Sequence, residues 1–224
     1  YFKIIAFLIG KMRFLILAII VALSAMLSVD CQKSSLLTDL EKISEATNLP
    51  IPRNSPASQI DQYGCWCYLS SNFEKGKSAP VDEIDQLCKE MADGYECAII
   101  DGRSGQTCNE PWSETYNSAV QTVFMNPSLS IIDQCQLLNP GSTDCAIRAC
   151  IIQGSFNLKI FNRFFAGTLT VNPNFKHGNG FDINANCQTI KKTPSEKSCC
   201  GDYPNRFPFK NFGGVRQCCG GEVV

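Results

Sequence analysis

The chain has 224 residues, with 20 basic and 21 acidic side chains and a formal net charge of −1 at pH 7. This balance gives no cationic footprint for nucleic acid, so we expect no nucleic-acid partner. A hydrophobic fraction of 44% lets the chain bury a core, which excludes disorder by composition.

The first residues predict a secretory leader. Residue 1 is Tyr, so we interpret residues 1–11 as upstream of a start at Met12. Arg13 and the apolar run 14–27, which ends in small residues, are typical of a cleaved signal peptide. The alternative is a membrane anchor, which needs about 20 apolar residues without interruption. We therefore expect residues 1–28 to be upstream sequence and signal peptide. The mature protein would be secreted, would carry a charge of about −4 and would have no transmembrane segment.

Cysteine usage also indicates an extracellular protein. An even number of cysteines at this density in a secreted chain predicts up to seven disulfides. Zinc sites favour other Cys spacings and partner His residues, and the chain has one His, so we expect no metal or cofactor. The 14 candidate half-cystines are Cys31, Cys65, Cys67, Cys88, Cys97, Cys108, Cys135, Cys145, Cys150, Cys187, Cys199, Cys200, Cys218 and Cys219.

The first half of the chain predicts two helices around a loop. Leu36, Leu40 and Ile43 recur at helical spacing after a Ser34 or Ser35 cap, and the helix ends before Pro50. A proline-rich connector, 50–57, leads to a loop at 63–71. A second helix is predicted from Pro80 to Gly94. It places Ile84, Cys88 and Met91 on one stripe. The acidic residues of this helix are predicted to face water or, alternatively, to bind calcium or a mineral surface weakly: Asp82, Glu83, Asp85, Glu90, Asp93 and Glu96.

The second half predicts shorter elements. After a turn-rich loop at 101–111, helical patches within 112–138 are interrupted at Asn126-Pro127, and residues 144–152 form another helix. Alternation in 156–160 and β-branched residues in 168–171 favour strands. An Asn/Gly-rich loop, 172–186, precedes a terminal segment with two Cys-Cys pairs, which predicts a small disulfide-stapled unit.

The loop and the second helix together resemble secreted phospholipase A2. The matching residues are Tyr63-Gly64-Cys65-Trp66-Cys67, then Pro80-Val81-Asp82-Glu83, Asp85 and Cys88. The resemblance covers roughly residues 34–152 and implies a pairing of Cys67 with Cys88. It also implies that the loop carbonyls and an Asp bind calcium, which polarises an ester while a His activates water. The fold expected is mainly α and disulfide-rich. A phospholipase A2-like helical domain, 29–152, would be followed by a small irregular or β cysteine-rich extension, 153–224.

Departures from the family pattern fall on the chemically active positions. Met91 stands where the family has its His, and Ala92 stands where it has its calcium Asp. Tyr68 and Ser70 replace glycines, so the predicted calcium loop, Tyr63, Gly64, Trp66, Tyr68 and Ser70, is degenerate. Leu87 replaces one of two adjacent cysteines. Loss of a general base costs on the order of 10²–10⁴ in rate, and loss of the metal costs more. We therefore expect no catalytic residues, no bound metal and no enzyme activity.

Two functions are compatible with this pattern. The first is a non-catalytic structural or binding protein of an extracellular matrix, including a mineralised shell or skeletal one, whose partners would be matrix components or a mineral surface. Its terminal Cys-Cys segment resembles modules of invertebrate secreted and skeletal matrix proteins. The alternative is a calcium-dependent phospholipase A2 or a toxin-like lipid-binding protein. His177 is expected to be a loop histidine without a catalytic role. The aromatic residues Trp66, Trp112, Tyr203, Phe207, Phe209 and Phe212 form either a partner surface or a local core.

Overall fold

The computed structural model describes residues 31–48, 55–69, 76–102, 108–188, 196–219 and 221–223. The predicted leader and Ser70 lie outside these ranges. The described part is mainly helical, with short strands confined to the C-terminal segment. The first helix, α2, spans Cys31–Thr47, and the short α3 spans Pro56–Ile60. Leu36, Leu40 and Ile43 are buried as predicted, so α2 contributes its apolar face to the main core.

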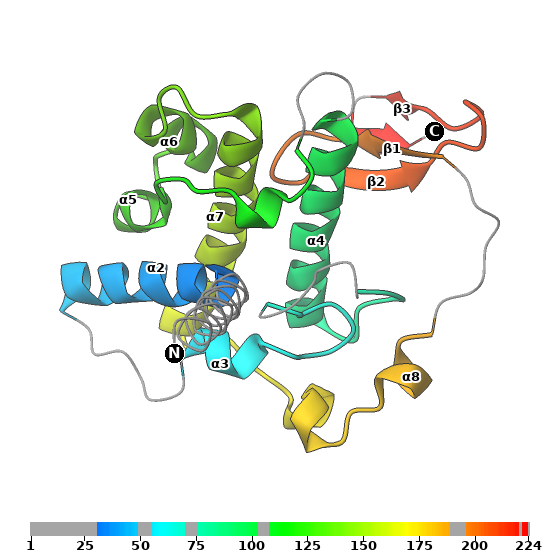
Figure 1. Cartoon of the computed structure of the whole chain (residues 1–224). Coiled ribbons are helices and arrows are strands. Elements are labelled where there is room, and N and C mark those ends of the chain that lie inside the picture. Colours follow the sequence, from blue (N-terminus) through cyan, green and yellow to red (C-terminus); the bar gives the residue numbers. More distant parts are fainter. Residues whose placement is uncertain are drawn as a thin grey trace, which may run out of the picture.

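Two long helices form the centre of the molecule (Figure 1). They are α4, Glu83–Gly102, and α7, Asp144–Phe165, and they pack side by side. The prediction that α4 ends at Gly94 was wrong, because Gly94 lies inside the helix against α7. A Cβ atom at this position would lie 3.2 Å from the Ile152 side chain. The glycine therefore permits close packing of the two helices instead of ending one of them.

Shorter helices cover the remaining face of α7. They are η2, Pro111–Ser113, α5, Val120–Met125, and α6, Ile131–Leu138. The predicted break at Asn126-Pro127 separates α5 from α6. Side chains cap α6 and α7: Ser130 accepts the Asp133 amide at the start of α6, and Thr143 accepts the Ala146 amide at the start of α7.

A chain of buried polar groups joins three helices. Tyr95 of α4 donates its hydroxyl to Gln153 of α7 at 2.8 Å, and Gln153 donates to Asn157 at 2.9 Å. Asn157 donates to the Asp39 carboxylate of α2 at 2.8 Å. All four side chains are buried, and burial raises the pKa of Asp39. Because buried polar groups need defined partners, this chain fixes how α2 and α4 seat on α7.

The predicted strand at 156–160 was wrong, because these residues continue α7. Phe156 and Ile160 are four residues apart, which places them on the same buried helical face. The proposed boundary after Ile152 thus falls inside a helix. Residues 168–171 are not a strand either. The chain then passes through η3, Pro173–Phe175, η4, His177–Asn179, and α8, Ile183–Asn186.

The C-terminal module, residues 196–223, is the only described part that contains strands. β1, Lys197–Cys200, pairs antiparallel with β2, Phe207–Lys210, and β3, Cys218–Cys219, pairs with β4, Glu222–Val223. Figure 1 shows the β1–β2 hairpin beside one end of α4. Arg206 binds both carboxylate oxygens of Asp101 at 2.8 and 3.0 Å, and Tyr203 donates to the same carboxylate. The Pro/aromatic segment therefore anchors the module on α4.

Twelve of the 14 cysteines form six disulfides among the described residues. Cys67–Cys88 joins the loop at 63–69 to α4, and Cys108–Cys145 and Cys135–Cys150 lie within the helical part. Two others attach later segments, Cys65–Cys187 and Cys97–Cys199, and Cys200–Cys218 closes the module internally. Cys219 is exposed and free, and the side chain of Cys31 is outside the described part.

None of the helices in the described ranges is both long and apolar enough to cross a bilayer.

Candidate functional site

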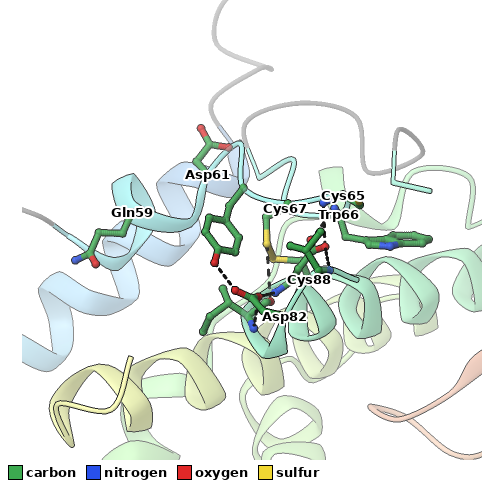
Figure 2. Close-up of a disulfide and its surroundings, with 12 residues drawn as sticks. Gln59, Asp61, Cys65, Trp66, Cys67, Asp82 and Cys88 are labelled. Carbon is green, nitrogen blue, oxygen red and sulfur yellow. Dashed lines mark hydrogen bonds between the residues drawn. A yellow bond between two sulfur atoms is a disulfide. The ribbon is translucent and has the colours of Figure 1, made fainter. Parts of the chain in front are cut away.

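The loop that resembles a calcium loop, residues 63–69, is held against the start of α4 (Figure 2). Cys67 pairs with Cys88, as the resemblance implied. The Asp85 carboxylate of α4 accepts the backbone amides of Cys65 at 2.9 Å and Trp66 at 2.7 Å. It also accepts the amide of Val81 at 2.9 Å. One buried carboxylate therefore fixes both the loop and the N-terminal end of the helix.

Gly64 is required by this arrangement. Its φ of +58° lies in the left-handed region that favours glycine. A Cβ atom here would lie 2.4 Å from Cγ of Asp85, which is closer than real contacts allow. The glycine that matches the family pattern therefore makes room for the carboxylate that organises the loop.

Tyr63 connects the loop to α4 and to the segment after α7. Its ring is fully buried, its hydroxyl donates to Asp82, and the same oxygen accepts the Asn172 amide at 3.2 Å. Burial and the adjacent Asp82 carboxylate raise the pKa of Tyr63 well above its usual value. The phenol is thus a neutral structural donor, which argues against a role in proton transfer near neutral pH.

Met91 and Ala92 occupy the two positions that the resemblance assigns to the catalytic base and the metal ligand. Met91 is 2% exposed and Ala92 is 8% exposed, and both belong to the main core. A thioether accepts no proton near neutral pH, and a methyl group binds no cation. The helix therefore presents neither of the two groups that water activation by this mechanism requires.

The loop residues do not fit a calcium ion. Calcium takes six to eight oxygen ligands, usually including carboxylates. Here each backbone carbonyl from residue 63 to 67 accepts a hydrogen bond from within the protein. The donors are the amides of Cys67, Lys77, Tyr68 and Tyr63 and the imidazole of His177. Asp85 is committed to three amides, and Ala92 supplies no oxygen.

His177 lies beside the loop, which its position in the sequence did not indicate. Its Nε2 atom is 2.7 Å from the Gly64 carbonyl oxygen, and its ring contacts Tyr68 at a centroid distance of 5.4 Å and stacks on Phe181 at 5.9 Å. Tyr68, which replaces a family glycine, is itself buried. The side chains of Tyr68 and His177 thus pack together at the loop. His177 hydrogen-bonds a backbone carbonyl there and packs on aromatic rings, and it is not paired with a nucleophile in the described ranges.

The prediction that all the acids of α4 face water was wrong for two of them. Asp85 is fully buried because the loop at 63–69 folds over its carboxylate, and Asp93 is 9% exposed. Asp93 accepts a hydrogen bond from the ammonium of Lys89 on the preceding turn, and burial raises the pKa of Asp93. Glu83 is exposed and forms a bidentate pair with Arg163 at 2.6 and 2.7 Å. Within the described ranges, no group of three or more Cys, His, Asp or Glu could hold a metal ion.

A second surface feature is a groove of about 440 Å³ between α4 and the C-terminal module. Its helical wall includes Gln86, Lys89 and Asp93, and its other wall includes Asn205, Arg206 and Phe207. The walls carry both signs of charge and an aromatic ring. Because disulfide Cys97–Cys199 and the Arg206–Asp101 pair hold the walls together, the groove is preformed.

Of the aromatic residues predicted to form a partner surface or a local core, some pack inside the protein and one is exposed. Trp112 packs edge-on against buried Tyr95, and Trp66 lies below the ammonium of Lys89 at 5.2 Å from the ring centroid. The Tyr203 ring contacts the guanidinium groups of Arg148 and Arg206, whose Cζ atoms lie 5.8 and 5.9 Å from its centroid. Phe212 is 52% exposed. Most of the named aromatic rings therefore have structural partners, and Phe212 faces solvent.

Comparison with known proteins agrees with the local resemblance. The acidic phospholipase A2 KBf-grIB of Bungarus fasciatus is 29% identical over 79 residues, which are 35% of this chain and 52% of that protein. The similarity is partial. The chain spans about half the length of this curated relative. No protein-family model and no solved structure matches the chain. The comparison supports a distant, phospholipase A2-like relation within a disulfide-rich, mainly helical protein.

Proposed function

We propose that this protein is a secreted, non-catalytic binding or structural protein built on a phospholipase A2-like helical scaffold. The observation that carries the proposal is Met91, buried at 2% exposure in the position of the expected base. His177 does not occupy that position, because it lies on η4 and not on α4, and its Nε2 atom is hydrogen-bonded to the Gly64 carbonyl. The six disulfides and the partial similarity to a phospholipase A2 support an extracellular location.

A lipolysis assay tests the absence of catalysis. The full secreted protein is mixed with phospholipid micelles in millimolar calcium or in chelator, and released fatty acid is measured by mass spectrometry. An active secreted phospholipase A2 serves as the positive control. We expect release no greater than that of the protein-free blank. Release that chelator abolishes would favour the alternative, a calcium-dependent phospholipase A2, in line with the similarity to the Bungarus fasciatus phospholipase A2.

The finer part of the proposal is a role in an extracellular matrix, including a mineralised one. Its support is a mildly acidic mature chain with carboxylates on the described surface, among them Glu41, Glu45 and Glu110. Carboxylate oxygens suit hard cations such as those of a mineral face. The preformed groove beside α4 is the candidate surface for an organic matrix component.

Fractionation of the source tissue tests the matrix role. We expect the protein in the insoluble or mineral fraction, with release on demineralisation. Recovery of nearly all of it as freely soluble protein in body fluid would contradict this part of the proposal while leaving the lipolysis result unaffected.

A further inference from the structure

Three residues of the segment after α7 line the backbone that leads into the loop. Phe175 accepts the Gly64 amide at 2.9 Å, and the His177 amide donates to the Gln62 carbonyl at 3.1 Å. Between them, Lys176 forms an antiparallel bridge with Tyr63. Disulfide Cys65–Cys187 holds the same segment to the loop from its other side. The segment 175–177 therefore pairs with the loop like a short added strand.

The side chain of Lys176 enters a cluster of carbonyl oxygens. Its ammonium donates to the carbonyls of Ser58 at 2.8 Å, Gln59 at 3.0 Å and Asp61. These carbonyls end the five-residue helix α3, where carbonyls lack intrahelical partners. Together with the two bonds from His177, the segment 175–177 supplies a donor to five backbone carbonyls between residues 58 and 64.

A cluster of converging carbonyls is a site of negative potential that favours a cation. A Lys ammonium is a compact charge with three donors, which matches three carbonyls. Because it is covalently part of the chain, it competes with dissolved ions at a high effective concentration. A dissolved cation would have to displace this ammonium to use the same three oxygens.

We propose that Lys176 is a built-in cation that fixes residues 58–64, and with them the loop that follows, without a bound metal ion. The loop is then closed permanently, and its order depends on the segment after α7 instead of on dissolved calcium. The inference concerns the stability of the loop, so it stands or falls separately from the lipolysis result.

Removal of the ammonium tests this proposal. The variant Lys176→Ala of the full chain is compared with Lys42→Ala, which removes an exposed lysine from α2. We expect the Tm of Lys176→Ala to fall by at least about 5 °C relative to Lys42→Ala. Amide exchange of Gly64 and Cys67 should accelerate at least about tenfold in Lys176→Ala, while the amides in the middle of α7 keep their rates.

Chemical rescue separates a cation site from a general packing effect. Ethylammonium chloride should restore a large part of the lost Tm in Lys176→Ala. Sodium chloride at the same ionic strength should restore less, and neither salt should restore it in Lys42→Ala. If Lys176→Ala does not fold in plain buffer, it is refolded with ethylammonium, and folding only in its presence supports the proposal. Equal Tm values for the two variants, or no effect of ethylammonium on Lys176→Ala, would overturn it.

Discussion

The disulfide Cys97–Cys199 is the covalent tie between α4 and the C-terminal module, and its removal has a calculable cost. The two cysteines are 102 residues apart. An isolated cross-link of that span would stabilise the fold by about 4.7 kcal/mol in the chain-entropy account. Other disulfides shorten the path, however, because the chain can be followed from Cys97 to Cys88, across to Cys67, and through Cys65 to Cys187 and Cys199. This ring has about 25 residues, which reduces the stabilisation to about 3.5 kcal/mol.

The variant Cys97→Ala/Cys199→Ala tests that value by urea unfolding followed by circular dichroism. We expect the free energy of unfolding to fall by about 3.5 kcal/mol, with a larger m-value because the unfolded chain expands. The matched control is Cys200→Ala/Cys218→Ala. It removes a bond that closes a loop of 18 residues within the module, for which the same account gives about 3.2 kcal/mol, while the tie to α4 remains. A loss below about 1 kcal/mol in the first variant would refute the reasoning, because the module would then unfold separately from the helices.

Further substitutions test individual contacts. Asp85→Ala should cost about 3–5 kcal/mol in urea unfolding, because it leaves one buried and two partly buried amides without an acceptor, and a loss under about 1 kcal/mol would contradict the role of Asp85. Arg206→Lys keeps the charge but loses the bidentate geometry, so we expect a loss of about 1–2 kcal/mol and faster amide exchange in β2; unchanged exchange would argue against the anchor. Burial raises the folded-state pKa of Asp39, so the folded protein binds this proton more tightly than the unfolded chain does. The Asp39 contribution to stability should therefore grow as pH falls from 7 through the raised pKa. Between pH 7 and pH 5, the parent should therefore gain unfolding free energy relative to Asp39→Asn. A gain by Asp39→Asn relative to the parent would exclude this assignment.

The helical elements with strong periodicity were predictable from the sequence. Leu36, Leu40 and Ile43 sit on the buried face of α2, and the break at Asn126-Pro127 separates two helices. The strand predicted at 156–160 failed because Phe156 and Ile160 satisfy helical spacing as well as alternation, and packing against α4 decides between the two. Gly94 was interpreted as a helix end, although its role depends on Ile152, a residue 58 positions away.

The candidate site was predictable only in its local part. Gly64, Cys67 and Cys88 share one continuous stretch of pattern, and the structure brings them together. Asp85 was predicted to face water because helical spacing alone cannot show that a loop will fold over a carboxylate. The contacts of Lys176 and His177 with residues 58–64 join segments more than 100 residues apart. A Cys65–Cys187 pairing is the one sequence signal that would have placed them there, and cysteine positions alone do not give connectivity.

Calcium titration by isothermal calorimetry tests the central claim most directly, which is that protein donors and not a metal ion close the loop. The full secreted protein is titrated to several millimolar calcium, a range that includes the affinities of weak extracellular calcium modules. We expect no saturable heat and no change in Tm with calcium. A saturable one-site isotherm, accompanied by slower amide exchange at Gly64 and Cys67, would contradict the account.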